Sequence, residues 1–156
     1  MQIMTSYFYQ IRNFTPNMIP LSTAMWDPKW FHQNKGQKYQ FKDKNGVWNG
    51  LRAEPFVPGP LCNHLCRGPE FCHTKDPACC PFLKKYREQL DRLDINNILN
   101  RVSFIGNQIQ QLEGFTEEPI IVFIVHEAPQ NLCSERIVIQ QWFRDNDVCV
   151  QEFVKK

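Results

Sequence analysis

Residues 119–125, with the sequence PIIVFIV, form the segment that most restricts the fold of this 156-residue chain. Its six consecutive apolar side chains give a strand that is apolar on both faces. Such a strand is normally central in a sheet that helices cover on each side. The segment therefore predicts a fold of the α/β class.

Amphipathic helices are predicted before and after this strand. Apolar residues recur at three- to four-residue spacing over residues 82–93, which is the helical period. Asp94 can cap a second helix that ends at Gly114, and Ser134 can cap a third that runs to about Arg144. Helices that connect parallel strands make right-handed crossovers, so we expect a three-layer, Rossmann-like sandwich with a mostly parallel sheet.

Three further strands are expected around the central one. The segments Ile3–Ile11 and Met18–Met25 suit strands, and Val148–Val154 closes the chain as the last strand. Residues 32–52 are polar and basic, carry interleaved aromatic side chains and show no clear period. By default the charge-rich part around Lys35 to Lys44 is a solvated surface.

Length and composition exclude several classes of protein. A chain of 156 residues suffices for one domain with a real core, so we expect a single domain over residues 1–156. Hydrophobic and charged fractions of 42% and 22% are those of folded soluble proteins, and no apolar run is long enough to cross a membrane. The first residues lack the pattern of a secretory signal, so a cytoplasmic location is expected. The net charge of +2 does not by itself require a nucleic-acid partner.

Five of the seven cysteines lie close together in the segment 58–81, which we expect to be an inserted loop without regular structure. They are Cys62, Cys66, Cys72, Cys79 and Cys80. In a reducing compartment a disulfide framework does not persist, so clustered thiols indicate metal ligands. Because two adjacent cysteines rarely bind one ion together, Cys80 is preferred to Cys79 as a ligand. The predicted ligand set is Cys62, Cys66, Cys72 and Cys80.

The sequence leaves two alternatives for the bound cofactor. Structural zinc would hold a loop that is too poor in apolar residues to fold alone. A [4Fe-4S] cluster is the alternative, since a final cysteine before a proline, here Cys80-Pro81, occurs in such sites. The spacing of the four cysteines matches neither the paired zinc pattern nor the ferredoxin pattern. His64 and His73 are either alternative ligands or polar loop residues.

Ionisable residues follow the central strand, where ligands bind in open α/β sheets. Glu127 can transfer a proton, Cys133 lies before a helix whose dipole lowers a thiol pKa, and Arg136 can grip a carboxylate or phosphate. These three are the predicted catalytic residues. Each also has a structural alternative: Glu127 can bond the loop backbone, Cys133 can pack at the helix base, and Arg136 can pair with Glu127 or Glu135.

Several motifs are shared with a known family. They are the opening Thr5-Ser6-Tyr7-Phe8, Pro20-Leu21-Ser22 with Pro28-Lys29-Trp30, the helix from Tyr86 to Leu93 with Asp94, and Glu127, Cys133, Arg136 and Trp142 after the strand. In these motifs the chain resembles an uncharacterised family, the "domain of unknown function 488". The cysteine-rich loop lies outside the resemblance. Family members show a Cys-Tyr-Glu and a Cys-His-Arg tripeptide, where this chain has Val125-His126-Glu127 and Cys133-Ser134-Glu135-Arg136. The resemblance implies the α/β fold and brings no established reaction.

Two functional classes remain open. The first is a small metal-binding enzyme acting on an anionic or nucleotide-like small molecule, in a cleft lined by Glu127 and Arg136 with the ligand-binding residues Ser6, Tyr7, Ser22 and Trp26. The second is a nucleic-acid-associated module, in which the basic aromatic segment from Lys35 to Arg52 binds the partner and the metal is structural. Neither class requires a membrane.

Overall fold

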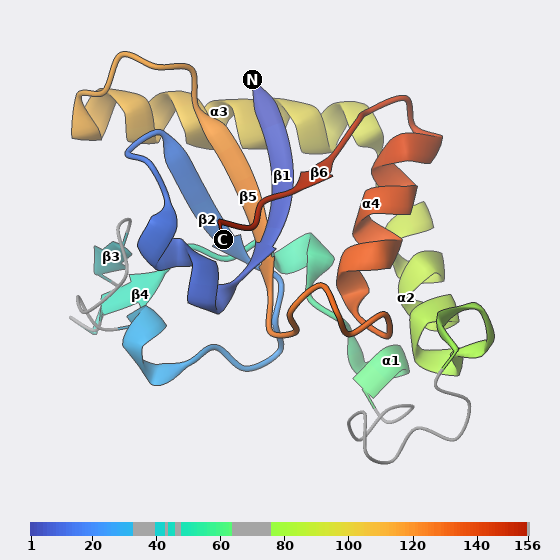
Figure 1. Cartoon of the computed structure of the whole chain (residues 1–156). Helices are drawn as coiled ribbons and strands as arrows, with labels where there is room; N and C mark the ends of the chain where they lie inside the picture. Colours follow the sequence, from blue (N-terminus) through green and yellow to red (C-terminus); the bar gives the residue numbers. More distant parts are fainter. Residues whose placement is uncertain (33–39, 43, 46–47, 64–75, 156) are drawn as a thin grey trace.

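A four-stranded, all-parallel sheet forms the centre of the molecule (Figure 1). The computed structural model describes residues 1–32, 40–42, 44–45, 48–63 and 76–155. The strands are β1 (Gln2–Tyr7), β2 (Met18–Ser22), β5 (Ile120–Val125) and β6 (Gln151–Glu152), in the order β2-β5-β1-β6. The apolar strand β5 therefore lies between two neighbours, which confirms the predicted α/β class and the central place of this strand.

Alternate side chains of β5 belong to two separate cores, one on each face of the sheet. Ile121, Phe123 and Val125 contribute to the first core, and Val122 and Ile124 to the second. All five are at most 2% exposed. Burial on both faces explains why the strand is apolar at every position instead of at every second one.

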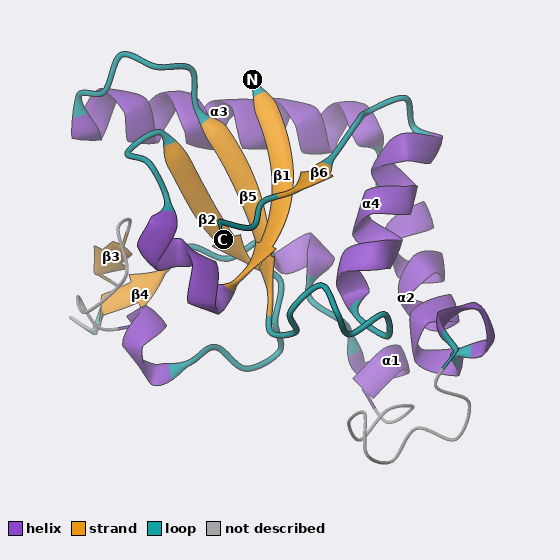
Figure 2. Cartoon of the chain, viewed as in Figure 1, coloured by secondary structure: helices purple, strands orange, loops and turns teal. Residues whose placement is uncertain are grey.

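The three long helices all pack in the first core. They are α2 (Pro81–Asp91), α3 (Ile95–Glu113) and α4 (Glu135–Asp145), and α2 lies beside α4 (Figure 2). The second face is covered mainly by short 3-10 helices, η1 (Phe8–Asn13) and η2 (Lys29–His32), through Phe8, Ile11 and Phe31. We expected helices on both faces. The layer on the second face is thinner because its apolar residues lie in short 3-10 helices of six and four residues. No helix in the described part of the chain has the length and apolarity that a membrane crossing needs.

The ends of α3 and α4 are where the sequence predicts them. The Asp94 side chain accepts a hydrogen bond from the Asn96 N–H, and Gly114 ends α3 in the left-handed conformation with φ 74°. The Ser134 side chain caps α4 by accepting from the Arg136 N–H. These ends are predictable because each is decided by one side chain and its nearest backbone groups.

The strands are shorter than predicted. The first ends at Tyr7, because Phe8 and Ile11 turn in η1 to fill the second core. The second ends at Ser22, not at Met25. The last strand keeps only Gln151–Glu152, because the Val148 N–H bonds the Phe143 carbonyl at the end of α4 (2.8 Å) and the chain joins the sheet later.

Two segments in which the sequence predicts no helix or strand contain short ones. A hairpin of β3 (Gln40–Lys42) and β4 (Trp48–Gly50) precedes η3 (Glu54–Phe56). The prediction that residues 58–81 form a loop without regular structure is wrong in part, since the segment contains α1 (Pro60–Asn63) and η5 (Pro77–Cys79). The Asp76 side chain starts η5 by accepting from the Ala78 N–H, a local capping signal that a search for long periods misses.

Candidate active site

A cavity of about 110 Å³ opens at the carboxyl ends of β2 and β5. Its walls are the loop after β2, residues 23–26, the end of β5 with residues 125–127, and Glu135 at the first position of α4. This is the edge at which open parallel sheets bind ligands, and a helix begins beside it. The cavity thus lies at the edge where the sequence predicts a site, and the site itself stays a prediction.

Two carboxyl groups line the cavity in different surroundings. The Ser134 hydroxyl donates a hydrogen bond to Oε2 of Glu127 (3.0 Å). Burial, and next to it the negative charge of Glu127, raise the pKa of Glu135 from 4.5 to about 7, against the opposing effects of its own backbone N–H and of Arg136. A carboxyl group with a raised pKa and a second, hydrogen-bonded carboxyl group thus line one space, which is an arrangement that acid–base chemistry uses.

The His126 side chain holds the loop after β2 at the cavity. A ring nitrogen, Nε2, of His126 bonds the Trp26 carbonyl, and the His126 ring lies 5.0 Å from that of Phe8. The Trp26 side chain itself is 81% exposed at the rim. His126 therefore positions the loop, and the Trp26 indole presents a free aromatic face beside the two carboxyl groups.

Arg136 points into the protein and is only 5% exposed. Its Nε atom pairs with the Glu152 carboxylate, its Nη2 donates to the Glu127 carbonyl (2.5 Å), and its guanidinium lies 5.9 Å from the centre of the Tyr7 ring. Arg136 Nη1 and Glu152 Oε2 are buried with no hydrogen-bond partner in the described part of the chain. The guanidinium is engaged inside the fold and does not line the cavity.

The other predicted site residues lie apart from the cavity. The Ser6 hydroxyl donates to the Phe153 carbonyl (2.7 Å), and the Tyr7 hydroxyl accepts from Gln10 (3.2 Å). Cys133 is half-buried before the cap of α4, and its N–H donates to Asn131 Oδ1 (3.0 Å). Of the seven residues predicted as catalytic or ligand-binding, the cavity brings together only Glu127 and Trp26.

Ser22 belongs to a buried polar cluster beneath the loop after β2. Its hydroxyl donates to Asp27, whose side chain is fully buried. Arg52 pairs with Asp27 (2.6 Å), donates to the Ala24 carbonyl (2.8 Å) and pairs with the exposed Glu54 (2.9 Å). The cluster fixes the loop that carries Trp26.

Sequence reasoning missed Asp27 and Glu135 as site residues. Asp27 stands among aromatic residues and gives no local signal of its ion pair with Arg52, which is distant in sequence. Glu135 did offer a signal, because it directly follows the cap Ser134 and so begins a helix at the strand end.

Only part of the predicted metal site lies in the described residues. Cys66 and Cys72 lie outside them, as do His64 and His73. Cys62 in α1 and Cys80 before α2 are buried in the first core, whereas Cys79 is exposed, and these three are not in disulfides. Burial raises the pKa of the Cys62 thiol. Among the described residues, no three His, Cys, Asp or Glu side chains are grouped to hold a metal ion.

The segment predicted to bind nucleic acid is described only in part, because residues 33–39, 43 and 46–47 lie outside the described ranges. Arg52, its last basic residue, is engaged with Asp27 and Glu54.

Comparison with known proteins finds no matching family model, no matching curated protein and no matching solved structure.

Proposed function

We propose that this chain is a small α/β enzyme that carries out proton transfer on a small polar molecule at the carboxyl edge of its parallel sheet. One observation carries the proposal: Glu135, half-buried at the start of α4, shares a cavity with Glu127 and has a pKa raised to about 7 by burial and by that neighbour. Near neutral pH Glu135 supplies a proton and Glu127 accepts one.

The lining of the cavity defines the class of substrate. Two carboxyl groups and no lysine or arginine are among its described lining residues. A hydroxyl-bearing, amide or basic substrate fits this lining better than the anionic or nucleotide-like molecule expected from the sequence, because that expectation depends on Arg136. The Trp26 indole offers an aromatic face for a flat part of the substrate that extends beyond the cavity.

A ligand-detected and protein-detected NMR titration with imidazole and a panel of small amines, amides and alcohols tests this proposal. Binders should shift the amide signals of residues 23–26 and 126–127, and Glu135→Gln or Glu127→Gln should weaken binding. Glu113→Gln, at an exposed position at the end of α3, is the matched control and should leave binding unchanged. Shifts confined to other parts of the sheet, or shifts equal in all three variants, contradict the proposed site.

We also propose that the cysteine-rich segment binds a metal, zinc or alternatively a [4Fe-4S] cluster, through Cys62, Cys66, Cys72 and Cys80. The support is the burial of Cys62 and Cys80 as free thiols on either side of the segment 64–75, which carries the other two cysteines. A bound metal would keep these thiols deprotonated and tie α1 to the start of α2.

Elemental analysis and a visible spectrum after anaerobic purification distinguish the two cofactors. Iron with labile sulfide and a brown colour indicates a cluster, and one zinc in colourless protein indicates a structural site. Cys62→Ser and Cys80→Ser should each release the metal, while Cys149→Ser, an exposed cysteine far along the chain, should not. Metal-free native protein contradicts this proposal and leaves the cavity proposal standing.

Membership of the "domain of unknown function 488" family is a further proposal. It is supported by the motif positions: Thr5-Ser6-Tyr7 ends β1 and Pro20-Leu21-Ser22 ends β2, and these strands flank β5. Nucleic-acid binding by the basic segment remains a prediction without a structural observation in its favour, and oligonucleotide affinity that falls steeply with salt would support it.

A further inference from the structure

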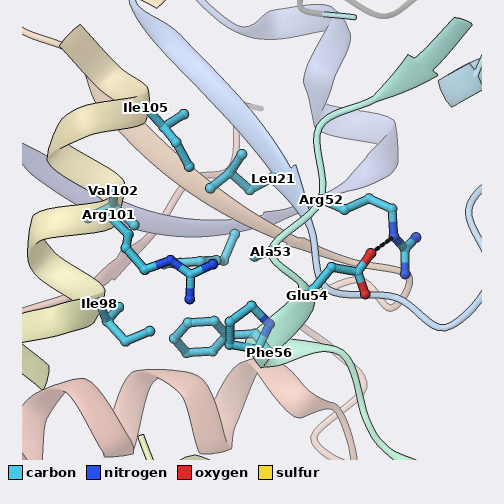
Figure 3. Close-up of a pocket in the computed structure, with 11 residues that line it drawn as sticks. Leu21, Arg52, Ala53, Glu54, Phe56, Ile98, Arg101, Val102 and Ile105 are labelled. Carbon is cyan, nitrogen blue, oxygen red and sulfur yellow. Dashed lines mark hydrogen bonds and ion pairs between the residues drawn. The ribbon is translucent and has the colours of Figure 1, made fainter. Parts of the chain in front are cut away.

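A second cavity, of about 100 Å³, lies between α3 and residues 53–56, beside β2 (Figure 3). Its walls are mainly apolar, with Leu21 and Phe123 from the sheet, Val102 and Ile105 from α3, and Phe56 from η3. None of its lining residues belongs to the cavity at the carboxyl edge. It is therefore a separate candidate for ligand binding.

One cation at this cavity is free to bind a ligand. Arg101 projects from α3 toward Ala53 and Phe56 in Figure 3, and it is exposed. In the described part of the chain it has no hydrogen bond or ion pair. Arg52, the other arginine of the lining, already pairs with Glu54 (2.9 Å) and Asp27 (2.6 Å). Arg101 is thus the group that can recognise a ligand anion.

We propose that this cavity binds a short branched aliphatic carboxylate, with the hydrocarbon against the apolar wall and the carboxylate on the Arg101 guanidinium. Arginine binds a carboxylate through two parallel N–H groups, which fixes the orientation of the ligand. A dry cavity of about 150 Å³ can take benzene, so this smaller space suits a branched chain of four or five carbons.

The charges at the rim favour a carboxylate over an amine. Glu54 is the one acidic residue among the described lining residues, and Arg52 neutralises it. An amine would have to displace Arg52 from Glu54, and it would lie near the unpaired charge of Arg101. A carboxylate meets an available partner and breaks no existing ion pair.

A titration of the full chain with isovalerate, monitored by two-dimensional NMR, tests the inference. We expect saturable shifts at residues 98–105 and 53–56 with a dissociation constant of about 1 mM or below, the range open to a ligand of this size. Arg101→Gln should weaken isovalerate by about five- to tenfold and leave its amide, isovaleramide, unchanged. Arg144→Gln, which removes an exposed cation from α4, is the matched control and should change neither ligand.

Two further variants test the fit to the cavity and the charge at its rim separately. Ile105→Phe fills the cavity and should abolish binding of both ligands, with a thermal melt to show that the fold is kept. Glu54→Gln removes the nearby negative charge and should tighten isovalerate. No saturation by isovalerate, equal affinity for acid and amide, or full retention of binding in Arg101→Gln overturns the proposal, whatever the outcome at the carboxyl edge.

Discussion

Glu127 and Glu135 show how two residues of one chemical type take different roles through their surroundings. The Ser134 hydroxyl holds a carboxylate oxygen of Glu127 beside the start of α4. Glu135 is partly desolvated and lies near the negative charge of Glu127. Desolvation and like charge both favour the neutral form of Glu135, so this carboxyl group exchanges its proton near neutral pH.

Replacing Glu135 by Gln should change the dependence of stability on pH. The folded pKa of about 7 lies above the ordinary 4.5, so between these values the folded state keeps a proton that the unfolded chain releases. Stability of the native protein therefore falls as pH rises through this window, by at most about 3 kcal/mol. Urea unfolding at pH 4 and pH 8 should show a smaller fall for Glu135→Gln, and identical falls would contradict the raised pKa.

Removing Asp27 should destabilise the protein far more than removing the other partner of Arg52. Asp27→Ala leaves Arg52 and Ser22 without a buried carboxylate, which costs about 3 kcal/mol. The control, Glu54→Gln, alters an ion pair at a side chain that is 72% exposed and should cost less than about 1 kcal/mol. Equal losses in chemical denaturation would mean that the Asp27 cluster does not hold the loop.

Residue-scale prediction from sequence succeeds where the partners are close along the chain. The caps Asp94, Gly114 and Ser134 are of this kind. The orientation of the Arg136 side chain could not be predicted in this way. It depends on an ion pair with Glu152 on β6, and no local sequence pattern indicates that the two residues are close in space. The alternative prediction for Arg136 is an ion pair with Glu127 or Glu135, whereas its carboxylate partner in the fold is Glu152.

At the scale of elements, helix positions were more predictable than strand lengths. A helix such as α3 carries its period and both of its caps in one segment. A strand ends where its neighbours stop pairing, and that depends on distant parts of the chain: β1 stops at Tyr7, opposite the last residue of β5. The early turn into η1 follows from the need to cover the second face, which the sequence of β1 does not reveal.

Gly114 provides a test of how α3 is terminated. It has φ 74°, and a Cβ atom there would meet no other atom within 4 Å, so conformational strain is the only cost of a side chain. Gly114→Ala should lower the free energy of unfolding by about 1 kcal/mol. Gln111→Ala, at an exposed position of the same helix, should change it by less than about 0.5 kcal/mol. A neutral Gly114→Ala would show that the last turn of α3 contributes little.

At the scale of the whole molecule, the buried strand was enough to predict a parallel sheet with helices, and it directs attention to the carboxyl edge, where a cavity lies. It was not enough to predict which side chains reach that edge. Of the predicted residues, Glu127 and Trp26 line the cavity, because they immediately follow β5 or lie in the loop after β2. Ser6 and Arg136 are drawn elsewhere by Phe153 and Glu152, partners contributed by the last strand and the residue after it.

The raised pKa of Glu135 at the carboxyl edge is the central claim, and a carbon-13 NMR titration of the glutamate side-chain carboxyls measures it directly. The Glu135 carboxyl signal, assigned by its loss in Glu135→Gln, should titrate with a midpoint near the pKa of about 7. Glu127→Gln should lower that midpoint, because the neighbouring negative charge is removed. A Glu135 midpoint near 4.5, the ordinary value, unchanged by Glu127→Gln, would contradict the account.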